Sequence, residues 1–157
     1  MYLLLAVSVF IGVSCKENPH KVKLGGHEKD VEIVEFGDEF FAAGYSDTSA
    51  ILELRNKYPD FFDLFTYRVI QIGGLGEEQF FEGVKQFQTD TMILSIKKNV
   101  EQEFSDFSKI EAGLKNAFKY YQFHFPDNEL PVIYTYISGF NQSVVTANKI
   151  IGISLDK

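Results

Sequence analysis

The middle of the chain carries apolar residues at helical spacing. The spacing predicts about five helices, over residues 47–58, 60–70, 77–86, 90–104 and 106–123. Asp47 or Ser46 caps the first helix, and Pro59 ends it. Glu77 and Glu78 open the third helix, where their charge favours the positive end of the helix dipole. The pattern therefore predicts a helical layer.

Each predicted helix presents an apolar stripe, which is typical of a face packed against a core. In the last helix this stripe consists of Ile110, Leu114, Phe118 and Tyr121. We therefore expect the stripes to form core rather than cofactor sites. Weaker patterns before the first helix predict a strand over residues 31–36 and a helical turn at 39–41.

The pattern changes at Pro131, where β-branched and aromatic residues replace the helical periodicity. Three runs predict strands: 132–137, 144–147 and 150–155. Asn148-Lys149 predicts a tight turn between the last two. A helical layer followed by an antiparallel hairpin, or three-stranded element, predicts the α+β class for residues 31–157. Because the first of these strands is apolar on both faces, we expect it to be covered on both sides.

The last predicted strand ends close to Lys157. A strand this apolar at a free edge would pair with other chains, and natural domains cover such edges. We therefore expect more chain after Lys157, with residues 31–157 forming a domain that is incomplete at its carboxyl end.

An uncharged apolar run, YLLLAVSVFIGVS, occupies residues 2–14. It is too short to cross a bilayer as a helix, which takes about 20 residues, but it suits the apolar region of a secretory signal. Gly12-Val13-Ser14 leads directly into Cys15, and polar residues follow at once. This arrangement resembles a bacterial lipobox, in which the cysteine sulfur is diacylated and the chain is cut before it.

The lipobox resemblance implies a signal peptide at 1–14, lipid attachment at Cys15 and a tether at 15–30. Each buried acyl carbon contributes about 0.8 kcal/mol and one chain binds only reversibly, so two or three chains, palmitate among them, make the anchor lasting. The sequence departs from the lipobox pattern in two ways. Gly12 stands where Leu, Val or Ile is preferred, and no Lys or Arg precedes the run. The alternatives are an uncleaved signal anchor and a buried amino-terminal segment.

Composition narrows the class of partner. The formal net charge of −7 weighs against nucleic acid, which calls for a clustered basic surface, and against electrostatic binding to anionic lipid. Cys15 is the single cysteine, so no internal disulfide can form. The chain has 16 Phe and 8 Tyr but no Trp, and these large rings can hold a small core together.

No motif points to catalysis, a cofactor or a bound metal. His27-Glu28 is followed by Val31 where an HExxH motif needs its second histidine, and neither His20 nor His124 completes such a pair. His124 is expected at a helix end or at the rim of the core.

Two further groups of residues are interpreted as structural. The glycine-rich run at 73–76 lacks the preceding strand and the Lys-Ser/Thr pair of a P-loop, so it is predicted to be an inter-helix loop. Glu101, Glu103 and Asp106 are interpreted as a solvated helix face rather than an acid–base pair.

Taken in order, four features of the chain resemble the gliding-motility lipoproteins of the GldB type, found in the Bacteroidetes. They are the apolar signal with Cys15, RNKYPDFFDLF at 55–65, FKYYQFHFP at 118–126 and PVIYTYISGFNQSVVTANKIIGISLDK at 131–157. The resemblance covers nearly the whole chain, and its specificity comes mainly from the last two segments. In that family the chain continues well past this point.

The resemblance implies a non-catalytic structural or assembly role in gliding motility and the linked protein secretion. The partners would be the membrane, through the lipid on Cys15, and other proteins of the envelope or motility apparatus. The implied location is the cell envelope, facing the periplasm or on the outer membrane. An alternative follows from a likeness to the amino-terminal half of zincin-like metallopeptidases, in which a catalytic HExxH helix would lie beyond Lys157.

Overall fold

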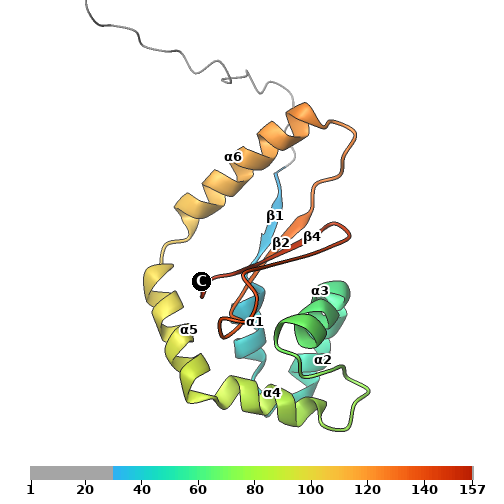
Figure 1. Cartoon of the computed structure of the whole chain (residues 1–157), viewed down its shortest axis with the longest axis vertical. Coiled ribbons are helices and arrows are strands. Elements are labelled where there is room, and N and C mark those ends of the chain that lie inside the picture. The colour runs from blue at the N-terminus through green and yellow to red at the C-terminus, as the bar shows by residue number, and fades with distance from the viewer. Residues whose placement is uncertain (1–29, 157) are drawn as a thin grey trace, which may run out of the picture.

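A computed structural model describes residues 30–156, which form a four-stranded sheet with helices on either side (Figure 1). The α+β class is confirmed. In chain order the elements are β1 (Glu32–Val34), α1 (Phe36–Ala43), α2 (Thr48–Lys57), α3 (Pro59–Leu64), the π-helical turn η1 (Phe65–Val69), α4 (Phe80–Thr89), α5 (Thr91–Glu103), α6 (Ser108–His124), β2 (Val132–Tyr136), β3 (Val144–Ala147) and β4 (Ile150–Ser154).

The sheet is mixed, with strand order β1-β2-β4-β3. The β3–β4 hairpin is antiparallel as predicted. The three predicted strands lie in one sheet with β1, and β2 pairs in parallel with both β1 and β4, a pairing that the sequence did not predict. At the centre of this arrangement Ile133 lies between Ile33 and Ile151. All of β2 after Val132 is buried, as expected for a strand covered on both faces.

The expectation that the last strand forms a free edge is wrong. β4 pairs with β2 on one side and β3 on the other, so its backbone is satisfied within the sheet. The edges of the sheet are β1 and β3. The prediction that residues 31–157 form a domain incomplete at its carboxyl end is not tested by this pairing and stays a prediction.

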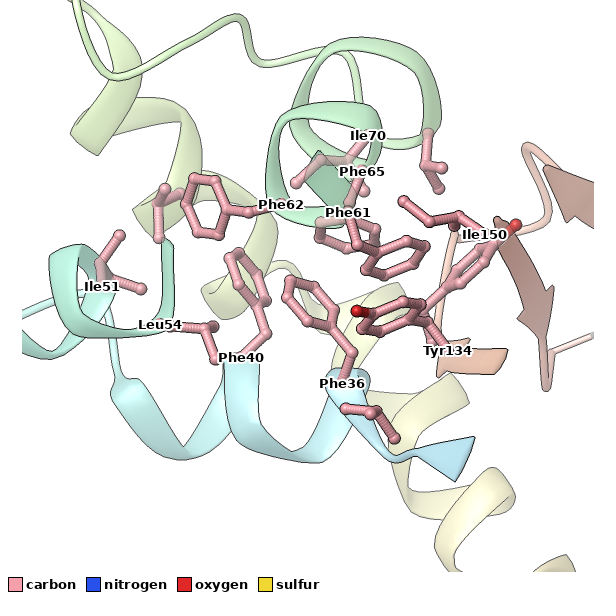
Figure 2. Packing of buried hydrophobic residues seen from close by; sticks show 14 of the residues in the cluster. Phe36, Phe40, Ile51, Leu54, Phe61, Phe62, Phe65, Ile70, Tyr134 and Ile150 are labelled. Atoms are coloured by element: carbon pink, nitrogen blue, oxygen red, sulfur yellow. The ribbon is translucent and has the colours of Figure 1, made fainter. Parts of the chain in front are cut away.

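The core lies between one face of the sheet and the helices from α1 to α4, and it is dominated by aromatic rings (Figure 2). The Phe36 ring has no solvent exposure and contacts Phe61 edge-on, with ring centroids 4.8 Å apart. Phe61 in turn stacks on Tyr134 of β2, with centroids 4.1 Å apart. Such ring pairs contribute beyond the area that they bury. The phenylalanine rings of the helices thus join the helical layer to the sheet.

The turn from β1 into α1 explains why the first strand is shorter than predicted. Phe36 already belongs to α1, and Gly37 packs directly against the backbone of β2. A Cβ atom on Gly37 would lie 3.1 Å from the Cα of Tyr136, so a larger residue would require the helix and the strand to move apart by a few tenths of an ångström. The predicted helical turn at 39–41 is part of α1.

The observed helix caps agree with the sequence prediction better than the observed first residues of the helices do. Asp47 accepts hydrogen bonds from the N–H groups of Ser49 and Ala50, which confirms it as the cap of α2. Pro59 begins α3 at its first position rather than merely ending α2.

The predicted helix over residues 77–86 starts later, at Phe80. Glu77 instead accepts a hydrogen bond from the Gly74 N–H at 3.0 Å, which closes the glycine-rich loop. The expected role of Glu77 and Glu78 in a first helical turn is therefore wrong, while the loop itself is confirmed.

The apolar stripe of α6 is not core, contrary to expectation. No residue of α6 is buried, and Ile110 keeps 41% of its surface exposed. The helix runs along the side of the sheet opposite to α2 and α3 (Figure 1), and an ion pair of Lys119 with Asp30 joins it to the start of β1 at 3.1 Å. The periodicity reported an amphipathic helix correctly, but this helix only partly covers the sheet.

Candidate functional site

Three parallel strands end at the same edge of the sheet, and polar side chains gather there. Ser138 follows β2, Ser154 closes β4, and Asp156 comes two residues later. All three are buried, with Asp156 only 7% exposed. Ligands of open sheets with parallel strands bind at the carboxyl ends of those strands. This edge is therefore the candidate functional site.

The Asp156 carboxylate holds the loop after β2 against the end of β4. One of its oxygens, Oδ2, accepts hydrogen bonds from the backbone N–H groups of Ser138 at 3.1 Å and Phe140 at 2.8 Å. The other, Oδ1, accepts from the Ser138 hydroxyl at 3.2 Å and from the Ser154 hydroxyl. Gly139 adopts a left-handed φ of 67° between the two N–H donors, a conformation that glycine adopts without steric cost.

Burial alone would raise the pKa of Asp156. Hydrogen bonds to its charged form, from Ser154, from the Phe140 N–H and from Ser138, outweigh burial and hold the pKa below its usual value. Burial, and after it the charge of Asp156, raise the pKa of Tyr136 to about 12. The Tyr136 hydroxyl therefore stays protonated at neutral pH, and it donates to the Gln142 carbonyl at 3.1 Å.

A groove of about 480 Å³ opens beside Asp156, between α5 and the end of β4. Its volume falls within the range of small-ligand sites. Its lining is mostly apolar and comes from three parts of the chain: Ile96, Asn99, Val100, Glu103 and Phe104 of α5 and its end, Phe140 of the loop, and Leu155 with Asp156. The groove thus offers a mostly apolar surface with two carboxylates in its lining, the exposed Glu103 and the buried, hydrogen-bonded Asp156.

The neighbouring cavity is smaller, about 50 Å³, and more acidic. Glu35, Asp38 and Glu101 line it together with Thr135 of β2. Burial, and then the nearby carboxylates of Asp38 and Glu111, raise the pKa of Glu35. Residues 30–156 contain no group of three or more His, Cys, Asp or Glu side chains arranged to hold a metal ion.

Ser138, Ser154 and Asp156 form a hydrogen-bonded cluster at this edge, which we call the Asp156 clamp. The Asp156 carboxylate is taken up by four donors, and the hydroxyls of Ser138 and Ser154 lie 3.0 Å apart and both point at it. A nucleophilic serine needs a general base within hydrogen-bond reach. Within residues 30–156, the base bonded to these hydroxyls is the Asp156 carboxylate, which also accepts from two backbone N–H groups. The hydrogen bonds thus order the loop after β2 against the end of β4.

The predicted lipid-attachment residue, Cys15, lies outside the described residues, as do His20 and His27. His124 ends α6, exposed, with its ring against Phe123 at 5.2 Å, so its expected place at a helix end is confirmed.

The acidic residues Glu101, Glu103 and Asp106 are all exposed, which agrees with a solvated face. Glu101 pairs with Lys97 one turn earlier in α5. Asp106 accepts from the Ser108 N–H and hydroxyl at the start of α6. Across the described part of the chain, no helix has both the length and the apolar character needed to cross a bilayer.

Sequence reasoning did not identify the Asp156 clamp. Its signal was the recurrence of Ser138, Ser154 and Asp156 directly after apolar strands, all at one end of the sheet once the strands are parallel. The sequence predicted the hairpin of β3 and β4 but not the direct parallel pairing of β2 with β4, which brings these residues together.

The fold and the site define the class: an α+β protein in which a buried cluster of polar side chains borders a mostly apolar groove. The chain belongs to the family of gliding motility protein GldB, whose family model matches residues 17–157. No curated protein and no solved structure matches the chain. The resemblance read from the sequence is confirmed at the level of the family.

Proposed function

We propose that this protein is a lipid-anchored component of the cell envelope, with a non-catalytic structural or assembly role in gliding motility and the linked protein secretion. The observation that carries the proposal is the family match over residues 17–157, together with the lipoprotein label in the name of that family model, GldB_lipo. The anchor is the lipid on Cys15, after removal of residues 1–14 as a signal peptide.

Residues 15–30 then serve as a tether between the membrane and the folded domain. A spacer of 16 residues can extend to about 55 Å, so the domain can reach partners that stand well off the lipid surface. The groove beside Asp156 supports a role in binding, because its lining is mostly apolar and because hydrogen bonds to Asp156 hold the loop that borders it.

Deleting the gene tests the role in motility and secretion. We expect the deletion strain to lose most of its gliding and most of its secreted protein, and the unaltered gene to restore both. A gene encoding Cys15→Ala should restore neither, because the product stays unanchored.

Gliding speed and the amount of protein released into the medium are the two measurements, and the second serves for a host that does not glide. A deletion strain that is normal in both would contradict the proposal. The metallopeptidase alternative places its catalytic helix beyond Lys157, and it stays a prediction.

A further inference from the structure

The outer edge of β3 presents unpaired backbone groups. The Ser143 carbonyl accepts from the Ser154 N–H at 2.9 Å, and Val145 lies opposite Gly152 in the same ladder. In an antiparallel ladder, alternate residues exchange hydrogen bonds with the neighbouring strand. Val144 and Thr146, which fall between these positions, therefore turn their N–H and C=O groups away from β4. Within residues 30–156 nothing bonds to these four groups.

The two edges of the sheet differ in how they are protected. Sheet edges are usually blunted by charged side chains, proline or a covering segment. β1 contains Glu32 and is flanked by Asp30 and Glu35, so carboxylates guard that edge. The run FNQSVVTAN from 140 to 148, which contains β3, has neither a charged residue nor a proline. Within this run, the feature that limits pairing is the short length of β3, which has four residues.

The side chains beside the edge suit an added strand. Val144 is 56% exposed and lies opposite Ile153, and Thr146 lies opposite half-buried Ile151 on the same face of the sheet. A groove of about 310 Å³ separates this face from α6, with Thr146 and Ile151 on one wall and Phe118 on the other. A further strand would cover Val144 and place every second side chain along this groove.

We propose that the β3 edge binds an extended segment of a partner protein, neutral or basic in charge, which joins the sheet as a fifth strand. The backbone groups of Val144 and Thr146 form the hydrogen bonds, and Val144 packs against a side chain of the added strand. A second copy of this chain fits less well, because each copy carries a formal net charge of −7. Neither the lipid on Cys15 nor gliding is needed for this contact.

Peptide binding to the whole chain, ¹⁵N-labelled and held in detergent micelles, tests the proposal. The probes are heptapeptides in which Thr alternates with Val, Lys or Glu. We expect the Val and Lys peptides to bind and the Glu peptide to bind about tenfold more weakly or worse. On binding, the amides of Val144 and Thr146 should become protected from hydrogen exchange, while the amide of Val145 is protected from the start.

Two variants block the edge by different means. Thr146→Pro removes an outward N–H that the ladder does not use, and Val144→Lys places a charge at the contact. Each should weaken peptide binding about tenfold or more, whereas the control Thr146→Val, which keeps the N–H and the β-branch, should not. Continued protection of the Val145 amide verifies that the hairpin is intact in each variant.

Three results would each overturn the proposal. One is that no peptide binds at about 1 mM. Another is that Thr146→Pro and Val144→Lys both bind as tightly as the unaltered chain, or that the peptides protect amides elsewhere. The third is a concentration-dependent dimer of the chain that Thr146→Pro abolishes, since this would assign the edge to a second copy.

Discussion

Phe36→Ala is expected to destabilise the domain by about 3–5 kcal/mol, the usual cost of removing a fully buried phenylalanine ring. Phe36 is at the centre of the aromatic core, and its ring contacts others from α1, α3, η1 and β2. The cavity cannot collapse readily, because Gly37 fixes the same turn against the backbone of Tyr136. Domains of this size are stable by about 5–15 kcal/mol, so much of that margin is lost.

Urea denaturation of the non-lipidated chain, residues 16–157, measures this effect. The matched control is Phe125→Ala, which removes the same ring from a site 53% exposed just after α6. The control should change the free energy of unfolding by less than about 1 kcal/mol. If Phe36→Ala shifts the free energy no more than Phe125→Ala does, the aromatic core is not the main support of the fold.

Asp156→Asn is expected to lower the free energy of unfolding at neutral pH by about 2–3 kcal/mol. The amide oxygen can take the place of Oδ2 and accept from the N–H groups of Ser138 and Phe140, but these bonds lose the carboxylate charge that strengthens them. The NH₂ group then faces the hydroxyls of Ser138 and Ser154, which can no longer donate to this position. The loss should also release the loop that borders the groove, which amide exchange at Phe140 will report.

The pH dependence of this difference follows from the lowered pKa of Asp156. Because the folded-state pKa lies below the usual 3.8, the stabilisation is complete above that value and is lost as the pH falls through the folded-state pKa. The stability gap between the unaltered chain and Asp156→Asn should therefore be constant near neutrality and shrink below pH 3.8.

The control for this prediction is Asp127→Asn, in the exposed turn after α6, which should change stability by less than about 0.5 kcal/mol at neutral pH. A gap between the unaltered chain and Asp156→Asn that widens in acid would mean that the carboxylate destabilises the folded state.

Local patterns predicted the elements well, and long-range pairing poorly. Asp47 as a cap, the loop at 73–76 and the β3–β4 hairpin each depend on neighbours in the sequence, so the sequence carries their signal. The parallel pairing of β1 with β2 joins strands that lie far apart along the chain, and β1 is only three residues long. No local pattern marks such a partner.

The α6 stripe shows a second limit of periodicity. Ile110 and its neighbours have the spacing of a core face, yet the helix has no buried residue. Spacing reports that one face is apolar, but the tertiary fold decides how far that face is covered. The sequence did not predict the Asp156 clamp for the same reason, because Ser138, Ser154 and Asp156 come together only through the order of the strands in the sheet. Cys15 is a purely local prediction, and it stays a prediction.

Metabolic labelling with an alkyne analogue of palmitate tests the lipid anchor most directly. The account predicts that the protein takes up the label in growing cells, that its amino terminus is Cys15, and that Cys15→Ala abolishes the labelling. Equal labelling of the Cys15→Ala variant, or an unlabelled protein that retains residue 1 and a free thiol, would contradict it.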